Sequence, residues 1–155
     1  MPTRADPFRP IAFAPTVLRG WTFRSDREGW WSAAGDEQLY ASDVDLGTVC
    51  EGKLAAERAD LLSEVFAESN RRNGGTPRPA RANERPEHGD HAMVCRVSSS
   101  PGVRNLSCGF ARDGSAALIG IEYTVYGDIP EAQLAERGTR AIERVAAAVL
   151  PPAAR

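Results

Sequence analysis

The chain has 155 residues, of which 42% are hydrophobic, 26% charged and 7% aromatic, which fits one globular domain and excludes a collagen, a coiled coil and a wholly disordered chain. Nineteen lysines and arginines stand against 21 aspartates and glutamates, so the formal net charge is -2. Without a net positive charge the chain has no general field that would hold a phosphate backbone, and we do not expect nucleic acid as a partner.

The first 16 residues contain four prolines, which predict an extended arm because proline fixes its own backbone angle and disfavours helix at the residue before it. The short apolar run over 11–18 is interrupted by Pro15. A secretory signal needs an unbroken apolar run, and a membrane span needs about 20 apolar residues. We therefore expect a cytoplasmic protein that does not act at a membrane.

Residues 17–150 are predicted to form one domain, with 151–155 as a tail. Alternating apolar positions predict three strands between residues 17 and 42. Over residues 49–70 the apolar period becomes that of a helix, for which Thr48 and Glu51 are expected to form the capping box and Leu54 to lie on the buried side. The segment 71–90 is rich in proline and glycine and has no large apolar side chain, so it is predicted to be a mobile loop.

Three further strands are predicted within 93–97, 106–110 and 117–126, followed by a helix that Asp128 and Glu131 cap. This order of elements predicts an α+β single-domain two-layer sandwich, in which one antiparallel sheet of about six strands carries both amphipathic helices on one face. The order resembles that of small α+β sandwiches such as secretion chaperones, PsbP-like proteins and immunity proteins, while no sequence motif identifies a family.

The segment from Gly47 to Lys53 has the spacing of a phosphate-binding loop, with Gly47, Gly52 and Lys53 as candidate nucleotide ligands. Such a loop needs a serine or threonine after the lysine to bind magnesium, and Leu54 stands there. The start of a helix is therefore the favoured interpretation, and a nucleotide site is the alternative.

Both histidines of the chain lie in the segment 87–91. His88, Asp90 and His91 would supply two or three metal ligands, whereas a transition metal needs three or four that converge. The sequence shows no second cluster to complete the set. A solvated loop is favoured over a metal site, and no cofactor is expected.

The cysteines allow a prediction of strand register. If Val97 lies opposite Leu106 in a hairpin, Cys95 lies opposite Cys108, and both side chains point to the buried face. Two reduced, buried thiols are the favoured interpretation, and a disulfide between Cys95 and Cys108 is the alternative. A disulfide would place the protein outside the reducing cytoplasm.

Trp30 and Trp31 are adjacent in a predicted strand and therefore point to opposite sides of the sheet. One of them enters the core, and the other is covered by the N-terminal arm or by a partner. The first predicted helix also carries an acidic stripe on its polar side, which suits either solvent or a basic partner; the stripe consists of Glu57, Asp60, Glu64 and Glu68.

These features favour a non-catalytic protein-binding module, similar in role to a chaperone, an adaptor or an immunity protein. It would recognise another protein through the exposed tryptophan of the pair and the acidic helix face, and a homodimer is left open. The alternative is an enzyme that acts on a small ligand or uses a metal, with a pocket near the 71–90 loop.

Overall fold

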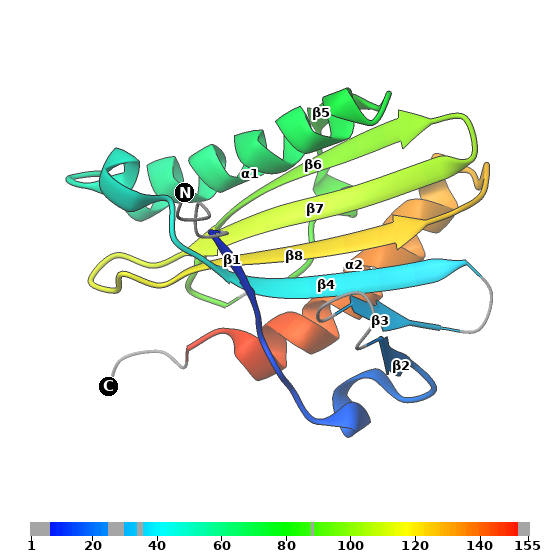
Figure 1. Ribbon diagram of the computed structural model, residues 1–155, viewed down its shortest axis with the longest axis horizontal. Coiled ribbons are helices and arrows are strands. Elements are labelled where there is room, and N and C mark those ends of the chain that lie inside the picture. Colours follow the sequence, from blue (N-terminus) through cyan, green and yellow to red (C-terminus); the bar gives the residue numbers. More distant parts are fainter. Residues whose placement is uncertain (1–6, 25–29, 34–35, 88, 152–155) are drawn as a thin grey trace, which may run out of the picture.

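The structure is a computed structural model that describes residues 7–24, 30–33, 36–87 and 89–151. One antiparallel sheet of eight strands forms its centre, and two helices pack on this sheet (Figure 1). The helices are α1 (Ala55–Arg72) and α2 (Glu131–Val149). The strands are β1 (Phe8–Pro10), β2 (Thr22–Arg24), β3 (Trp30–Ser32), β4 (Glu37–Val44), β5 (Thr76–Pro79), β6 (Ala92–Ser100), β7 (Val103–Ala111) and β8 (Leu118–Val125).

The strands lie side by side in the order β2-β3-β4-β8-β7-β6-β5, and β1 also pairs with β4. The predicted α+β fold with one antiparallel sheet and two helices is confirmed. The two strands beyond the predicted number lie in proline-rich segments, β1 in the N-terminal arm and β5 in the segment 71–90. Proline lacks a backbone donor, but β5 is an edge strand that needs hydrogen bonds on one side only. Proline content alone therefore hides such strands from a reading of the sequence.

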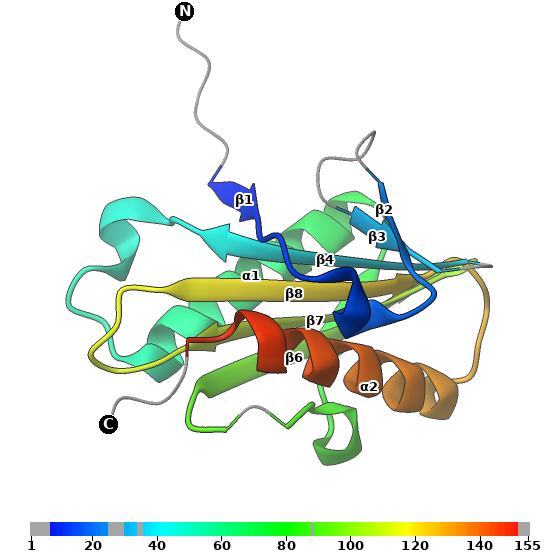
Figure 2. The same cartoon turned by 90° about the horizontal axis from the view of Figure 1, so that it is seen from below.

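The two helices cover opposite faces of the sheet, so the prediction that they share one face is wrong. A side chain at Gly109 of β7 would meet the carbonyl oxygen of Ala59 in α1 at 2.6 Å, whereas Gly138 of α2 lies over Leu106 of the same strand. Residues 106 and 109 point to opposite faces because side chains alternate along a strand. Figure 1 shows α2 behind the sheet. In Figure 2, which is turned by 90°, α2 lies along the lower side of the sheet. The fold thus has three layers.

Both helices begin later than the proposed caps require. Residues 47–50 form a short 3-10 turn, and α1 starts only at Ala55. Leu54 precedes the first turn and is 63% exposed, so it does not belong to the buried side. In place of Thr48 and Glu51, the carboxylate of Glu57 accepts from the N–H of Leu54 at 3.2 Å. Asp128 does not cap α2 either, because it accepts from the N–H of Gly102 at 2.7 Å.

Cys95 and Cys108 form a disulfide in the core between the sheet and α2. The predicted register is confirmed, since Val97 pairs with Leu106 and Cys95 with Cys108. The favoured interpretation of two reduced thiols is wrong for this structure. The third cysteine, Cys50, is free and partly exposed.

Alkylation of the unfolded protein tests this pairing. Without a reductant, iodoacetamide is expected to modify Cys50 alone, and after reduction it should modify all three cysteines, as read by mass spectrometry. Modification of Cys95 or Cys108 before reduction, in protein made in an oxidising compartment, would contradict the disulfide.

Candidate functional site

The two faces of the sheet differ in chemistry. On the face under α1, Leu62 and Phe66 pack on Val44, Ala111 and Leu118, and the buried apolar residues of this helix in that cluster end at Phe66. Toward the end of α1 the same face becomes polar. The face under α2 is apolar across the central strands, where its buried side chains are Leu39, Ala41, Cys95, Val97, Leu106, Cys108, Phe110, Ile119, Ile121, Tyr123 and Val125. A site with specific chemistry is therefore expected on the α1 side.

Two polar rows cross the α1 side of the sheet where α1 ends. Residues that lie directly opposite each other on neighbouring strands have side chains about 5 Å apart, so each member of a row contacts the next. The first row consists of Arg96, Ser107, Glu122, Tyr40 and Trp30. The second row consists of Ser98, Asn105, Thr124, Gln38 and Ser32.

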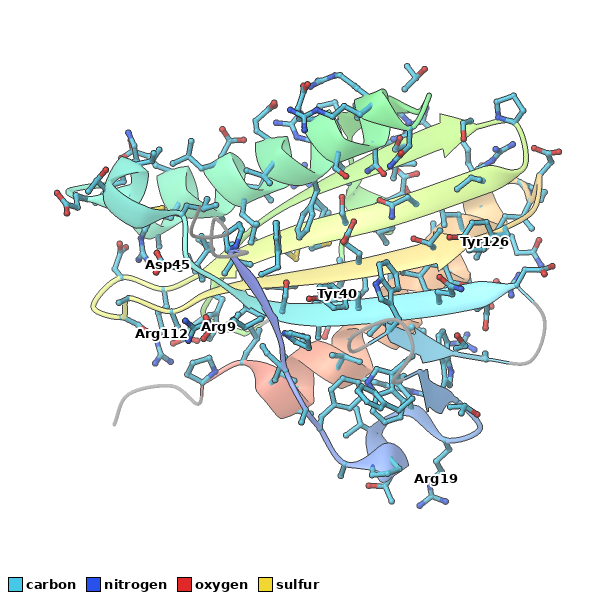
Figure 3. The ribbon with its side chains drawn as sticks, viewed as in Figure 1. Arg9, Arg19, Tyr40, Asp45, Arg112 and Tyr126 are labelled. Carbon is cyan, nitrogen blue, oxygen red and sulfur yellow. A yellow bond between two sulfur atoms is a disulfide. The ribbon has the colours of Figure 1, made fainter. Side chains whose placement is uncertain are left out.

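The helix α1 packs mainly on β5, β6 and β7, so among the described elements it leaves the part of this face over β4 and β3 uncovered and contacts β8 only weakly (Figure 1). Figure 3 shows Tyr40 over this open face and Tyr126 at the end of β8. We call Trp30, Tyr40, Glu122 and Tyr126 the aromatic–acid patch. A cavity of about 400 Å³ adjoins it, lined by Trp30, Ser69, Asn70, Asn73, Gly75, Ser98, Ser100, Val103, Asn105, Glu122, Thr124 and Tyr126.

Glu122 is the only charged residue among the described residues that line this cavity. Burial raises the pKa of its carboxyl group to about 7, although a hydrogen bond from the Asn105 side chain acts in the opposite direction. Asn105 is held in place, since it donates to Thr124 Oγ1 at 2.9 Å and accepts from Asn70 at 3.2 Å. No charged neighbour in the described part of the chain contributes to this pKa shift. The cavity therefore holds a carboxyl group that gains its charge near neutral pH.

Three buried hydroxyl groups on this face lack a hydrogen-bond partner within the described structure. One belongs to Ser32, at the end of the second row. The other two belong to Ser107, which lies beside Glu122 in the first row, and to Ser42, which lies opposite Gly120 on β4. Both residues have 0% exposure. Since buried polar groups are usually satisfied, these hydroxyls indicate a surface that is not optimised for stability alone.

The two adjacent tryptophans occupy different environments, as predicted from their alternation. Trp31 is 4% exposed, and Phe13 of the N-terminal arm stacks on it with ring centroids 4.6 Å apart. Trp30 lines the cavity and stacks on Tyr40 at 5.1 Å. The arm thus packs on the inward tryptophan through Phe13, whereas it was expected as one of two possible covers for the outward one. Trp30 faces the α1 side of the sheet. Tyr126, at the rim, is 44% exposed.

Each acid of the predicted stripe has a partner in the structure. Arg96 reaches from the sheet to Glu64 at 2.5 Å and to Asp60 at 3.4 Å. The other two acids are held on the helix or at its start, Glu68 by Arg71 and Arg72, and Glu57 by the N–H of Leu54. The stripe therefore offers less uncompensated charge than its sequence suggests.

The proposed metal ligands are only partly described, because His88 lies outside the described residues. His91 is buried, with Nδ1 3.3 Å from Asp90, and Asp90 lies 3.8 Å from Arg112. Within residues 7–24, 30–33, 36–87 and 89–151, no three histidine, cysteine, aspartate or glutamate side chains come together as a metal site requires.

The proposed nucleotide loop lacks the surroundings of a phosphate site. Gly47 and Gly52 have positive φ angles of 67° and 71°, and Lys53 is exposed. The helix start that would hold a phosphate is taken up by carboxylates, because Ala55 N–H donates to Asp113 at 2.9 Å beside the Glu57 bond. The preceding strand β4 is also antiparallel to its neighbours, whereas such loops follow a parallel strand.

A larger cavity of about 640 Å³ lies at the other end of the α1 side, near Arg9 and Asp45 (Figure 3). Arg58 at this cavity donates to the carbonyl of Arg112 at 2.9 Å, and Asp45 accepts from Gly47 at 2.8 Å. Its charged groups have both signs, and Arg58 and Asp45 bind backbone groups of nearby turns. The larger volume of this cavity therefore does not by itself make it the better candidate for a functional site.

Most of the aromatic–acid patch was absent from the residues proposed by sequence reasoning, which included only Trp30. The signal lay in β8, where the odd positions 119, 121, 123 and 125 are apolar and buried. Glu122 and Thr124 stand at even positions, which share one face. A central strand that is apolar on one face and polar on the other therefore indicates a candidate site on its polar face.

A scan against protein-family models and searches of curated proteins and of solved structures found no match for this chain. In the described part of the chain, neither helix has the combination of length and hydrophobicity that crossing a bilayer demands. Function is therefore argued from the geometry of the aromatic–acid patch.

Proposed function

We propose that the protein is a non-catalytic binding domain that recognises another protein through the aromatic–acid patch. The observation that carries this proposal is the row in which Trp30, Tyr40 and Glu122 lie side by side on the part of the sheet that α1 leaves open. Tryptophan and tyrosine combine a large apolar surface with one polar atom, and they often anchor protein interfaces. The described residues that line the adjoining cavity include no histidine, lysine or cysteine, so Glu122 has no such partner there for acid–base or nucleophilic chemistry.

The paired acids of α1 give this surface a second, weaker component. Asp60, Glu64 and Glu68 are about half exposed, and Arg96 of β6 pairs with the first two while Arg71 pairs with the third, so arginines offset part of their charge. Charges at the rim of an interface mainly affect the rate of association and the choice of partner. The helix face therefore guides a basic partner, and the aromatic–acid patch anchors it.

Peptides selected from a displayed random library against the wild-type protein test this proposal. Their affinity for Trp30→Ser, measured by calorimetry, is expected to fall about tenfold or more, because the variant removes the central aromatic anchor. The matched control is Phe23→Ser, which removes an exposed aromatic side chain on β2 that does not line the cavity. Thermal unfolding verifies that both variants are folded. Peptides that bind wild type and Trp30→Ser equally well would contradict the proposal.

A small molecule in the same cavity is the second candidate. The cavity volume of about 400 Å³ falls within the range of small-ligand sites. Asn73 and Gly75, which line it, come from the segment 71–90 where such a pocket is expected from the sequence. A small molecule would contact the same side chains as a partner protein. A comparison of a free amine with lysine-containing peptides separates the two candidates.

The disulfide supports a proposal about compartment. Structural disulfides persist in oxidising compartments and are rare in the reducing cytoplasm. We infer from the bond between Cys95 and Cys108 that the protein acts outside the cytoplasm, in place of the cytoplasmic expectation.

A further inference from the structure

The cavity beside the aromatic–acid patch has a negative electrostatic character. Of the described residues that line it, Glu122 alone carries a charge, and it is an acid. The last turn of α1 contributes Ser69, Asn70 and Asn73 to the wall. The carbonyl end of a helix carries a partial negative charge, which favours a cation nearby. Both features therefore select a positively charged ligand.

Among the described residues, no basic side chain lines the cavity or contributes to the environment of Glu122. Its cross-strand neighbours are Ser107 and Tyr40, and its hydrogen-bond partner is the amide of Asn105. Arg96 lies in the same row beyond Ser107, but its guanidinium group is bound to Ser63, Asp60 and Glu64. A largely desolvated carboxylate without a cation is costly, so a ligand cation that enters the cavity offsets part of this cost.

The other walls suit an alkylammonium group. Trp30 presents its ring to the cavity and is fixed by stacking on Tyr40, and Tyr126 adds an exposed ring at the rim. Aromatic faces attract ammonium cations and pack against methylene chains. A guanidinium group binds best through two parallel hydrogen bonds to both carboxylate oxygens, whereas Asn105 already engages the Glu122 carboxylate. An ammonium group needs only one oxygen.

We propose that the cavity binds the ammonium group of a lysine side chain of the partner protein, with Glu122 as its counter-ion and Trp30 and Tyr126 flanking its methylene chain. This inference rests on the proposed protein-binding function and names the side chain that is recognised. Free alkylamines carry the same ammonium group on an alkyl chain, so the experiment tests a free amine as well as a lysine side chain.

Titration followed by nuclear magnetic resonance at pH 8 tests this inference with three probes. They are Nα-acetyl-lysine methylamide, Nα-acetyl-norleucine methylamide, which lacks the charge, and free n-butylammonium. The lysine probe is expected to bind about tenfold more tightly than the norleucine probe, with shifts at the Trp30 indole, and this preference should vanish in Glu122→Gln. Glu64→Gln, which removes an acid already paired with Arg96, should keep the preference. Equal binding of the lysine and norleucine probes, or an unchanged preference in Glu122→Gln, would overturn the inference.

The outcomes separate this inference from the proposed function. If library peptides without lysine bind at Trp30, the protein-binding function stands and the lysine inference is wrong. If n-butylammonium binds as tightly as any lysine-containing peptide, the cation site stands as a site for free amines, and recognition of a partner protein through lysine is wrong.

Discussion

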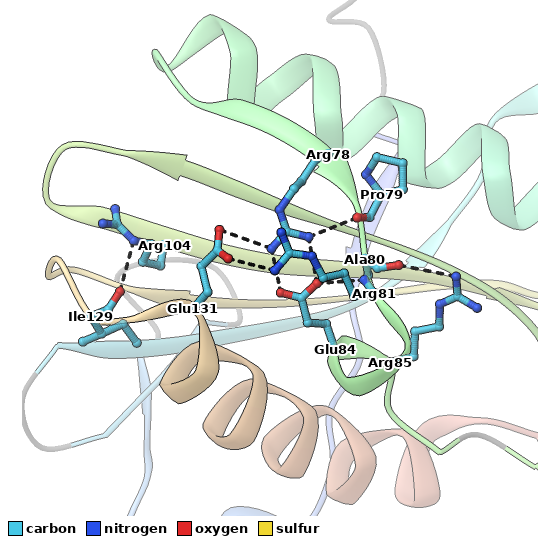
Figure 4. A network of polar contacts seen from close by, with 9 residues as sticks. All are labelled: Arg78, Pro79, Ala80, Arg81, Glu84, Arg85, Arg104, Ile129 and Glu131. Carbon is cyan, nitrogen blue, oxygen red and sulfur yellow. Dashed lines mark hydrogen bonds and ion pairs between the residues drawn. The ribbon is translucent and has the colours of Figure 1, made fainter.

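Glu84→Gln is expected to lower the free energy of unfolding by about 3 kcal/mol, because it breaks a buried ion pair in the segment that joins β5 to β6. Glu84 is 2% exposed and accepts two parallel hydrogen bonds from Arg78, each of 2.7 Å, and a third of 2.7 Å from the N–H of Arg81 (Figure 4). Glutamine keeps the shape but turns an N–H₂ group toward the guanidinium. Urea denaturation at pH 7 measures the change.

The matched control for this substitution is Glu131→Gln in the same network. Glu131 pairs with Arg81 at 3.0 Å and with Arg78 at 3.4 Å, but it is about half exposed (Figure 4). An exposed pair contributes little, so this variant should lose less than about 1 kcal/mol. Equal losses in the two variants would contradict the assignment of the stabilising pair to Glu84.

The pH dependence of the Glu84 contribution has a defined sign. The hydrogen bond from Arg78, more than the opposing effect of burial, lowers the pKa of Glu84 below its usual value. The folded state therefore favours the ionised carboxylate, and the stabilisation is complete above the ordinary glutamate pKa of about 4.5. It is lost as the pH falls through the lowered value. The gap between wild type and Glu84→Gln should thus narrow in acid.

The network around Glu84 also shows where sequence reasoning about the fold reached its limit. Periodicity located the central strands and the helices, because a buried face repeats every second or every third to fourth residue. The segment 71–90 has no such period, and its structure comes from Arg78 and Glu84, two charged residues that composition assigns to solvent. The faces of the helices were misjudged for a related reason. Gly109 and Gly120 accommodate α1 through the absence of side chains, which a search for apolar residues does not detect.

The aromatic–acid patch was less predictable than the fold because its members come from β3, β4 and β8 and the residue after β8. Only the strand register brings Trp30 beside Tyr40 and Tyr40 beside Glu122. Local spacing instead drew attention to Gly47–Lys53 and to His88–His91, which are contiguous in sequence. The alternation of Trp30 and Trp31 was inferred correctly, since it depends on two neighbouring residues of one strand.

Glu122→Gln is expected to have the opposite effect to Glu84→Gln and to raise the free energy of unfolding at pH 8 by up to about 3 kcal/mol. Burial raises the pKa of Glu122 from 4.5 to about 7, so the folded state binds a proton more tightly than the unfolded state does. Between these two values the wild type loses stability as the pH rises. The glutamine variant mimics the neutral form and should not show this loss.

Urea denaturation of wild type and Glu122→Gln at pH 4 and pH 8 measures the effect. The two proteins should be similarly stable at pH 4, where Glu122 is neutral in both states, and should differ at pH 8. Glu51→Gln, at an exposed position outside the aromatic–acid patch, serves as the control and should differ little from wild type at either pH. If Glu122→Gln is no more stable than wild type at pH 8, Glu122 is not an uncompensated acid.

Together the two substitutions distinguish an acid that stabilises the fold, Glu84, from an acid proposed to bind a ligand, Glu122. Glu84 has its cation within the chain, and its removal should harm folding. Glu122 has a raised pKa and lines a cavity, so its removal should favour folding near neutral pH but abolish the preference for lysine. An acid that costs stability at the edge of a cavity is what the proposed binding function predicts, because sites often depart from what stability alone would select. A gain in stability together with a loss of binding in Glu122→Gln is therefore the combined result that a lysine-binding site requires.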